Sequence, residues 1–139
     1  MALKIATAKK PRLFLLYTIA PEGFHPSKAN QVINNLIASD DTPLCIYHDH
    51  FLGQPGGIAI FDVKHLDEVD KLAQAINDNL PDWNSDLKPL IFSFNPAAFD
   101  QQIAYTTSAY GKQDWNALKQ EKRPSYGDPR KEVETASEE

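Results

Sequence analysis

Residues 44–63 have the sequence LCIYHDHFLGQPGGIAIFDV, in which two apolar runs flank a segment rich in glycine and proline. Residues 44–52 and 58–63 have the length and composition of β-strands. The glycines between them permit positive φ, and Pro55 blocks continuation of a strand. The sequence therefore predicts a β-hairpin with a five-residue loop, residues 53–57. These glycines do not form a phosphate-binding loop, because no helix follows them directly.

A further strand is predicted on the N-terminal side of this hairpin. Residues 12–20 are rich in Leu, Phe, Tyr and Ile and lie between Pro11 and Pro21. A nearly continuous apolar run is typical of a central strand that is covered on both faces. A fourth strand is predicted at residues 88–94, after a loop at 81–87. Pro89 suits an edge strand, because proline has no N–H to donate to a neighbour.

Two amphipathic helices are predicted between these strands. The first begins at His25 or Ser27, ends at residues 40–43 and carries apolar residues at helical spacing. The second spans residues 66–80, with acidic residues in its first turn, where the helix dipole favours negative charge. The apolar stripes are Ala29, Val32, Ile33, Leu36 and Ile37 in the first, and Leu66, Val69, Leu72, Ala73, Ile76 and Leu80 in the second.

The predicted order is strand, helix, strand, strand, helix, strand. This is an α+β fold of the ferredoxin-like βαββαβ kind, with a four-stranded antiparallel sheet and two helices on one face. Both faces of the strands are apolar: Leu15 and Tyr17 alternate with Phe14 and Leu16. Two helices cover one face only, and an exposed apolar face usually marks an interface. We therefore expect a homodimer.

A C-terminal helical extension is predicted after the sheet. Asn95 followed by Pro96 is a strong helix start, and Gly111 is expected to end that helix. Asp114 is expected to cap another turn. The apolar residues of this extension need a surface to cover, either the open sheet face or a second subunit; they are Phe99, Ile103, Tyr110, Trp115 and Leu118. The predicted organisation is a flexible leader at 1–11, the domain at 12–96, the extension at 97–120 and a disordered tail at 121–139.

The segment from Gly53 to Val63, the helix after it and the strand leading to Asn95-Pro96 give the chain a family resemblance. In this pattern it resembles the dimeric α+β-barrel superfamily, and it is similar to YCII-related proteins and muconolactone isomerases. The resemblance implies two sheets packed face to face, with a small molecule bound inside the barrel or between sheet and helices. An isomerase, a lyase or a cofactor-independent oxygenase would suit it. No family site residue can be matched to a position in this chain.

Composition excludes several classes of protein. The chain has 139 residues, 42% hydrophobic and 24% charged, with a net charge of −5. A nucleic-acid binder needs a dense basic surface, which this chain lacks. No apolar run is long enough to span a membrane. The single cysteine, Cys45, excludes an internal disulfide and favours a cytoplasmic location, and its apolar neighbours predict an inert, packed thiol.

The sharpest chemical feature is His48-Asp49-His50. On a strand the two imidazoles share a face and Asp49 points the opposite way. They can be solvent-facing residues at a strand end, a general acid or base near neutral pH, or two ligands of a metal completed by His25, Asp62 or a partner residue. We predict His48, His50 and His25 as catalytic candidates and assign no metal site. His25 has a competing interpretation as a helix cap.

Tyr17, Asp49 and Asp62 are the predicted ligand-binding residues, although Tyr17 equally suits a core tyrosine with its hydroxyl in solvent. The sequence identifies no cofactor. The first hypothesis for function is a small-molecule-binding protein or cofactor-independent enzyme, with a pocket on the sheet face of a homodimer. The alternative is a non-enzymatic homodimer that uses its C-terminal extension for assembly or partner binding.

Overall fold

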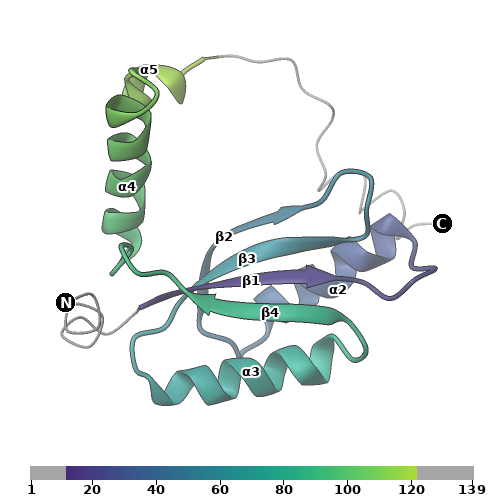
Figure 1. Ribbon diagram of the computed structural model, residues 1–139. Coiled ribbons are helices and arrows are strands. Elements are labelled where there is room, and N and C mark those ends of the chain that lie inside the picture. The colour runs from purple at the N-terminus through teal and green to yellow at the C-terminus, as the bar shows by residue number, and fades with distance from the viewer. Residues whose placement is uncertain (1–11, 122–139) are drawn as a thin grey trace.

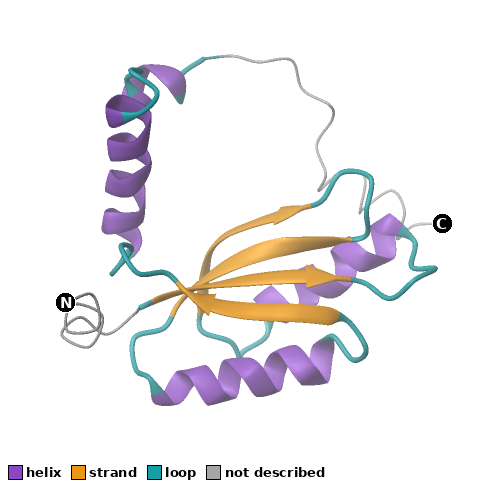
Figure 2. Ribbon diagram, viewed as in Figure 1, coloured by secondary structure: helices purple, strands orange, loops and turns teal. Residues whose placement is uncertain are grey.

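The computed structural model describes residues 12–121, so the predicted leader at 1–11 and nearly all of the predicted tail lie outside the described residues. In chain order the elements are β1 (Leu13–Ile19), α2 (Pro26–Ala38), β2 (Leu44–His50), β3 (Gly56–Asp62), α3 (Asp67–Asn79), β4 (Asn84–Pro89), α4 (Pro96–Ala109) and α5 (Trp115–Leu118). The predicted alternation of strands and helices is confirmed, and the fold is α+β (Figure 2).

The four strands form one antiparallel sheet in the order β2-β3-β1-β4. The chain order and the antiparallel sheet are consistent with the ferredoxin-like arrangement. Helices α2 and α3 both lie on the same face of the sheet (Figure 1). Strand β1 is central, as predicted, and β4 with its Pro89 is an edge strand, also as predicted.

The core lies between the sheet and these two helices. Residues that face each other across paired strands share a side of the sheet, so the pairs Phe14–Phe61 and Leu16–Ala59 belong to the covered face. They pack on the helices, whose buried residues are Ala29, Ile33 and Leu36 in α2 and Leu72, Ala75 and Ile76 in α3. Leu66 and Ala73, both assigned to the second stripe, are exposed, and Ala75 is buried instead.

Two glycines allow the hairpin and α2 to pack closely, and they correct the predicted loop. β2 ends at His50 and both glycines, Gly56 and Gly57, belong to β3, so the loop has the predicted five residues but spans 51–55 instead of 53–57. A Cβ atom at Gly57 would lie 2.4 Å from the carbonyl oxygen of Asp49 and 3.2 Å from Cδ1 of Ile33. Gly56 has φ of 150° and would place a Cβ atom 2.4 Å from the carbonyl oxygen of Thr18. Side chains are therefore excluded at both positions.

The predicted fourth strand was wrong in position. Residues 84–89 form β4, whereas the prediction placed a loop at 81–87 and the strand at 88–94. An edge strand buries few side chains, and in β4 only Leu87, opposite Leu16, packs against the core. The polar sequence NSDLKP therefore pairs with β1, while the apolar residues after it leave the sheet.

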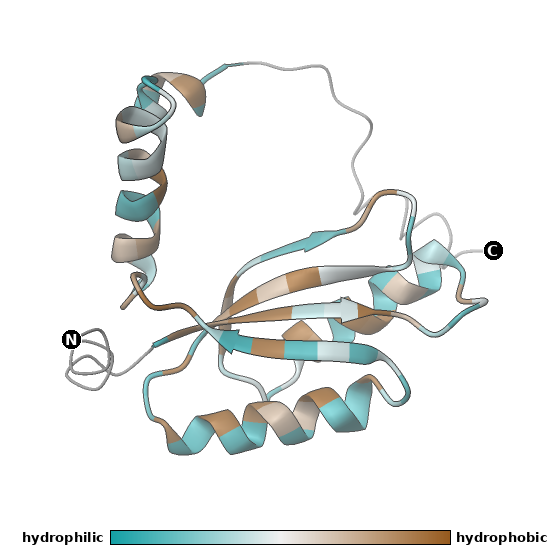
Figure 3. Ribbon diagram, viewed as in Figure 1, coloured by the Kyte–Doolittle hydropathy of each residue, from teal (hydrophilic) through white to brown (hydrophobic). Residues whose placement is uncertain are grey.

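Helix α4 rises on the side of the sheet opposite α2 and α3 (Figure 1). The predicted N-caps of α4 and α5 are confirmed: Asn95 Oδ1 accepts a hydrogen bond from the N–H of Ala98 at 2.9 Å at the start of α4, and Asp114 caps α5. None of the residues in α4 is buried, although apolar positions are scattered along it (Figure 3). Within residues 12–121 no helix is both long enough and apolar enough to cross a membrane.

Candidate functional site

The face of the sheet that α2 and α3 do not cover, called the open face below, carries Leu13, Leu15 and Tyr17 of β1 with Ile58 and Ile60 of β3. Leu13 and Ile60 are buried, whereas Tyr17 exposes 48% of its surface. No helix of residues 12–121 packs flat against this face (Figure 1). The described chain therefore leaves apolar side chains accessible at the end of the sheet where Tyr17 lies.

An aromatic patch occupies that end and is formed by Tyr17, Tyr47, Asp49 and Phe51. The rings of Tyr17 and Phe51 have centroids 5.2 Å apart. The hydroxyl of Tyr47 donates to Asp49 Oδ2 at 3.3 Å, and Asp49 Oδ1 accepts from the N–H of His50 at 2.8 Å. Partial burial, followed by the charge and hydrogen bond of Asp49, raises the pKa of Tyr47. Its phenol is therefore a stable donor, and Asp49 has acceptor capacity left for a ligand.

A β-bulge decides which face each β2 side chain occupies. Cys45 is paired with Phe61 and Tyr47 with Ile60, so Ile46 is an extra residue in β2. One inserted residue reverses the alternation of side chains beyond it. Cys45 consequently packs against the core, whereas Tyr47 and Asp49 face the open side.

His48 and His50 share a face, as predicted, and it is the face covered by the helices. Their partners in β3 are Ala59 and Gly57, and their ring centroids lie 5.5 Å apart. The Nδ1 atom of His50 is buried and has no hydrogen-bond partner among residues 12–121. Partial burial, reinforced by the charge of His48, lowers the pKa of His50, so this imidazole is neutral at pH 7. It can accept a proton, but from the side opposite Tyr17.

His25 has the capping role that competed with its catalytic assignment. Its Nδ1 atom accepts from the N–H of Ser27 at 3.2 Å and lies 2.6 Å from Ser27 Oγ. It is the N-cap of α2, where a side-chain acceptor satisfies an N–H that has no partner within the helix.

The carboxylate of Asp62 also has a structural role, because it forms an ion pair. This buried carboxylate accepts two hydrogen bonds from Arg12, at 2.5 Å to Nε and 3.0 Å to Nη2. Such a bidentate pair fixes the end of β3 against the start of β1. Of the predicted ligand-binding residues, the structure places Tyr17 and Asp49 together in the aromatic patch and holds Asp62 in this ion pair.

Two other predicted chemical features have clear outcomes. Within the described part of the chain, no group of three His, Cys, Asp or Glu side chains could hold a metal ion. The thiol of Cys45 donates to the carbonyl of Tyr47 at 3.2 Å, and burial raises its pKa. A raised pKa favours the protonated thiol, and the predicted packing of Cys45 against the core is confirmed.

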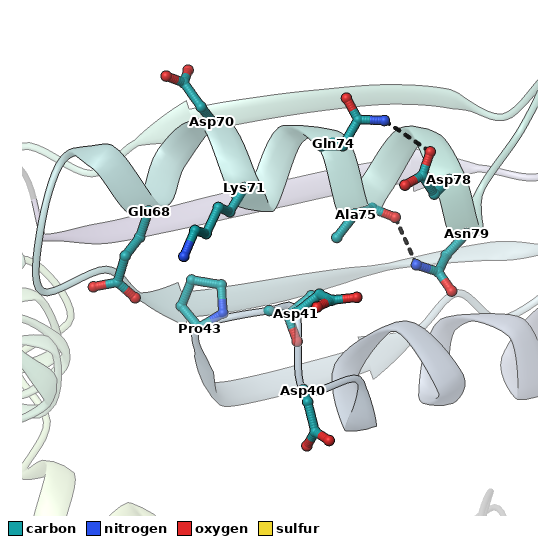
Figure 4. Close-up of a pocket in the computed structure, with 11 residues that line it drawn as sticks. Asp40, Asp41, Pro43, Glu68, Asp70, Lys71, Gln74, Ala75, Asp78 and Asn79 are labelled. Carbon is teal, nitrogen blue, oxygen red and sulfur yellow. Dashed lines mark hydrogen bonds between the residues drawn. The ribbon is translucent and has the colours of Figure 1, made fainter.

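Among the grooves on the surface of residues 12–121, two larger ones were not predicted from the sequence. One, of about 680 Å³, lies between α3 and the loop before β2 and is lined by five carboxylates and Lys71. Figure 4 shows Asp40 and Asp41 on the loop and Glu68, Asp70 and Asp78 on α3. The other, of about 490 Å³, lies between α4 and residues 90–93 and is mainly apolar. The sequence LIFSF at residues 90–94 did not predict this apolar groove, because the same apolar pattern is typical of a strand.

The chain was compared with protein-family models, curated proteins and solved structures. None of them matches.

Proposed function

We propose that this chain is a homodimeric small-molecule-binding domain, in which the open faces of two copies pack against each other as in the dimeric α+β barrels that the sequence resembles. The observation that supports this most strongly is the accessible aromatic patch on the open face. Aromatic side chains that are exposed together on a sheet are costly in water and favourable in an interface or ligand site.

The chemistry of the patch indicates the class of ligand. Tyr17 and Phe51 offer ring surfaces, and Asp49 offers a carboxylate that is held in place by Tyr47 and by a backbone N–H. A small aromatic molecule with a positive charge or a hydrogen-bond donor would satisfy both. Packed sheets lie about 10 Å apart, so a ring bound at the patch would be enclosed by the second copy.

The patch supports binding more directly than catalysis. The two histidines predicted as catalytic lie on the other face, so Asp49 and the phenols of Tyr17 and Tyr47 are the groups of the patch that can exchange a proton with a ligand held there. An enzyme of the isomerase or lyase type would use Asp49 as its base. A role for His48 and His50 would require a second site at the β2 edge.

Calorimetric titration of the full chain with tyramine, which combines an aromatic ring with an amine, tests the ligand class. We expect tyramine to bind more tightly than p-cresol, which lacks the amine. Asp49→Asn should weaken tyramine binding at least about tenfold, the effect of losing one charge-assisted hydrogen bond. The double variant His48→Ala/His50→Ala is the matched control and should bind as the wild type does.

Two results would count against the proposal. If neither compound gives a heat of binding, the open face is not a site for small aromatic molecules and the assembly role is favoured. If the histidine variant loses binding while Asp49→Asn retains it, the ligand lies on the helix-covered side of β2.

A further inference from the structure

We propose that residues 90–118, called the C-terminal arm below, clasp the second copy of the chain in the dimer. The apolar groove between residues 90–93 and α4 would receive the partner. This inference rests on the proposed function, because it requires a second copy opposite the open face. It adds an interaction surface, and it explains why an apolar segment leaves the sheet after β4.

The arm exposes apolar side chains that its own domain does not cover. Ile91 and Phe92 expose 54% and 65% of their surfaces. Across the groove from this segment, Phe99 and Ile103 come from α4, whose residues are all at least partly exposed. Removing such apolar surface from water is favourable, so binding of a partner to the arm would stabilise it.

The direction of the arm identifies that partner as a copy stacked on the open face. Helix α4 extends on the open side of the sheet (Figure 1). Its 14 residues at about 1.5 Å per residue give a length near 21 Å. A second sheet would lie about 10 Å above the first, and its helices about another 10 Å beyond. The arm is therefore long enough to pass both layers of the partner.

The area of the open face gives an independent reason. Strands of six or seven residues with about 3.4 Å per residue and about 4.8 Å between strands form a face of roughly 450 Å². A stable interface buries about 800 Å² on each partner. One side of a helix about 10 Å wide and 21 Å long adds roughly 210 Å². The open face alone is thus too small, whereas the open face and the arm together, at roughly 660 Å², come close to the usual size.

Two-fold symmetry makes the contact reciprocal, so each groove would hold the same segment of the other copy. Gln102 lines the groove, and its neighbour Gln101 is exposed and does not line it. Photo-crosslinking the full chain with p-benzoylphenylalanine in place of Gln102 should therefore give a covalent dimer. The same group in place of Gln101 should give little or none.

Mass spectrometry of the crosslinked products identifies the occupant of the groove. A crosslink from position 102 to residues 12–121 of a second copy supports the clasp. A crosslink within one chain to residues 122–139 overturns it and assigns the groove to the chain's own C-terminus. A dimeric protein that gives no crosslinked dimer from position 102 also overturns it.

A second measurement separates failure of the arm from failure of the dimer. Ile103→Asp places a charge in the groove and should raise the dimer dissociation constant about 100-fold, the effect of losing a central anchor residue. Tyr105→Asp changes an exposed residue of the same helix outside the groove and should leave it within a few-fold. If both variants dimerise like the wild type, the clasp is wrong and the packing of open faces stands. If the wild type is a monomer, both proposals fail.

Discussion

Replacing Tyr17 by alanine tests the packing of the open faces. Tyr17 lies on the central strand β1, paired with Ile58 on one side and Asp86 on the other. Its ring contacts that of Phe51, and the residue is 48% exposed in the single chain. A second sheet stacked on this face would cover the exposed half.

The size of the effect follows from that exposed half. A buried tyrosine removes about 150–250 Å² from water, so roughly 100 Å² remains to be covered by the partner. At about 25 cal/mol per Å² this is worth about 2.5 kcal/mol per copy. A two-fold dimer contains the contact twice, so Tyr17→Ala should weaken dimerisation by about 5 kcal/mol. The dissociation constant should rise by between about 10³- and 10⁴-fold.

The assay is sedimentation velocity over a dilution series, with Leu66→Ala as the matched control. Leu66 is 47% exposed but immediately precedes α3, which lies on the other side of the sheet. Its truncation should leave the dissociation constant unchanged within about threefold. Equal dissociation constants for the two variants, with both still folded by circular dichroism, would refute the packing of open faces.

Three further predictions concern the fold around the site. Gly57→Ala should lower the free energy of unfolding by about 2–3 kcal/mol, because the new methyl group meets a backbone oxygen. The control Gly53→Ala, at φ of 87° in open space, should lower it by only about 1 kcal/mol. Equal losses in urea unfolding would contradict the close contact between Gly57 and the backbone of Asp49. The pKa of His50 is lowered in the folded state, so the unfolded chain binds more protons and stability should fall as pH drops below about 6.5. His50→Gln should therefore flatten the plot of melting temperature against pH between about pH 7 and 5. An unchanged slope would contradict a lowered pKa for His50. Arg12→Ala should lower the melting temperature more than Asp62→Ala, because it leaves the more buried member of the pair without its partner; the reverse order would show that Asp62 is well solvated.

Much of the fold could be predicted from sequence because two signals agree along residues 12–80: the spacing of apolar residues, and the positions of residues that end helices and strands. The helices and the first three strands show this agreement. It ends at β4, where one inward residue, Leu87, is enough for an edge strand. The more apolar residues 90–94 were mistaken for that strand. The spacing of apolar residues along the chain cannot by itself distinguish residues that pair in a sheet from residues that line a groove.

The site could be predicted only in part, and one residue accounts for much of the difference between the predicted and the observed grouping of its side chains. The shared face of His48 and His50 follows from strand alternation, but which face they share depends on the bulge at Ile46. In a regular ladder, with Ile46 opposite Ile60, the histidines would join Tyr17 on the open face. A bulge of this kind has no distinctive composition in the run LCIYHDH, so the grouping of these residues needed the register of the sheet.

The measurement that tests the account most directly is the mass of the full chain in solution by sedimentation equilibrium. If two copies pack through their open faces and arms, the mass should be twice the chain mass of 15.6 kDa at micromolar concentration. It should fall toward one chain mass in Tyr17→Ala at the same concentration. A wild-type protein that remains at 15.6 kDa across the dilution series would contradict the account.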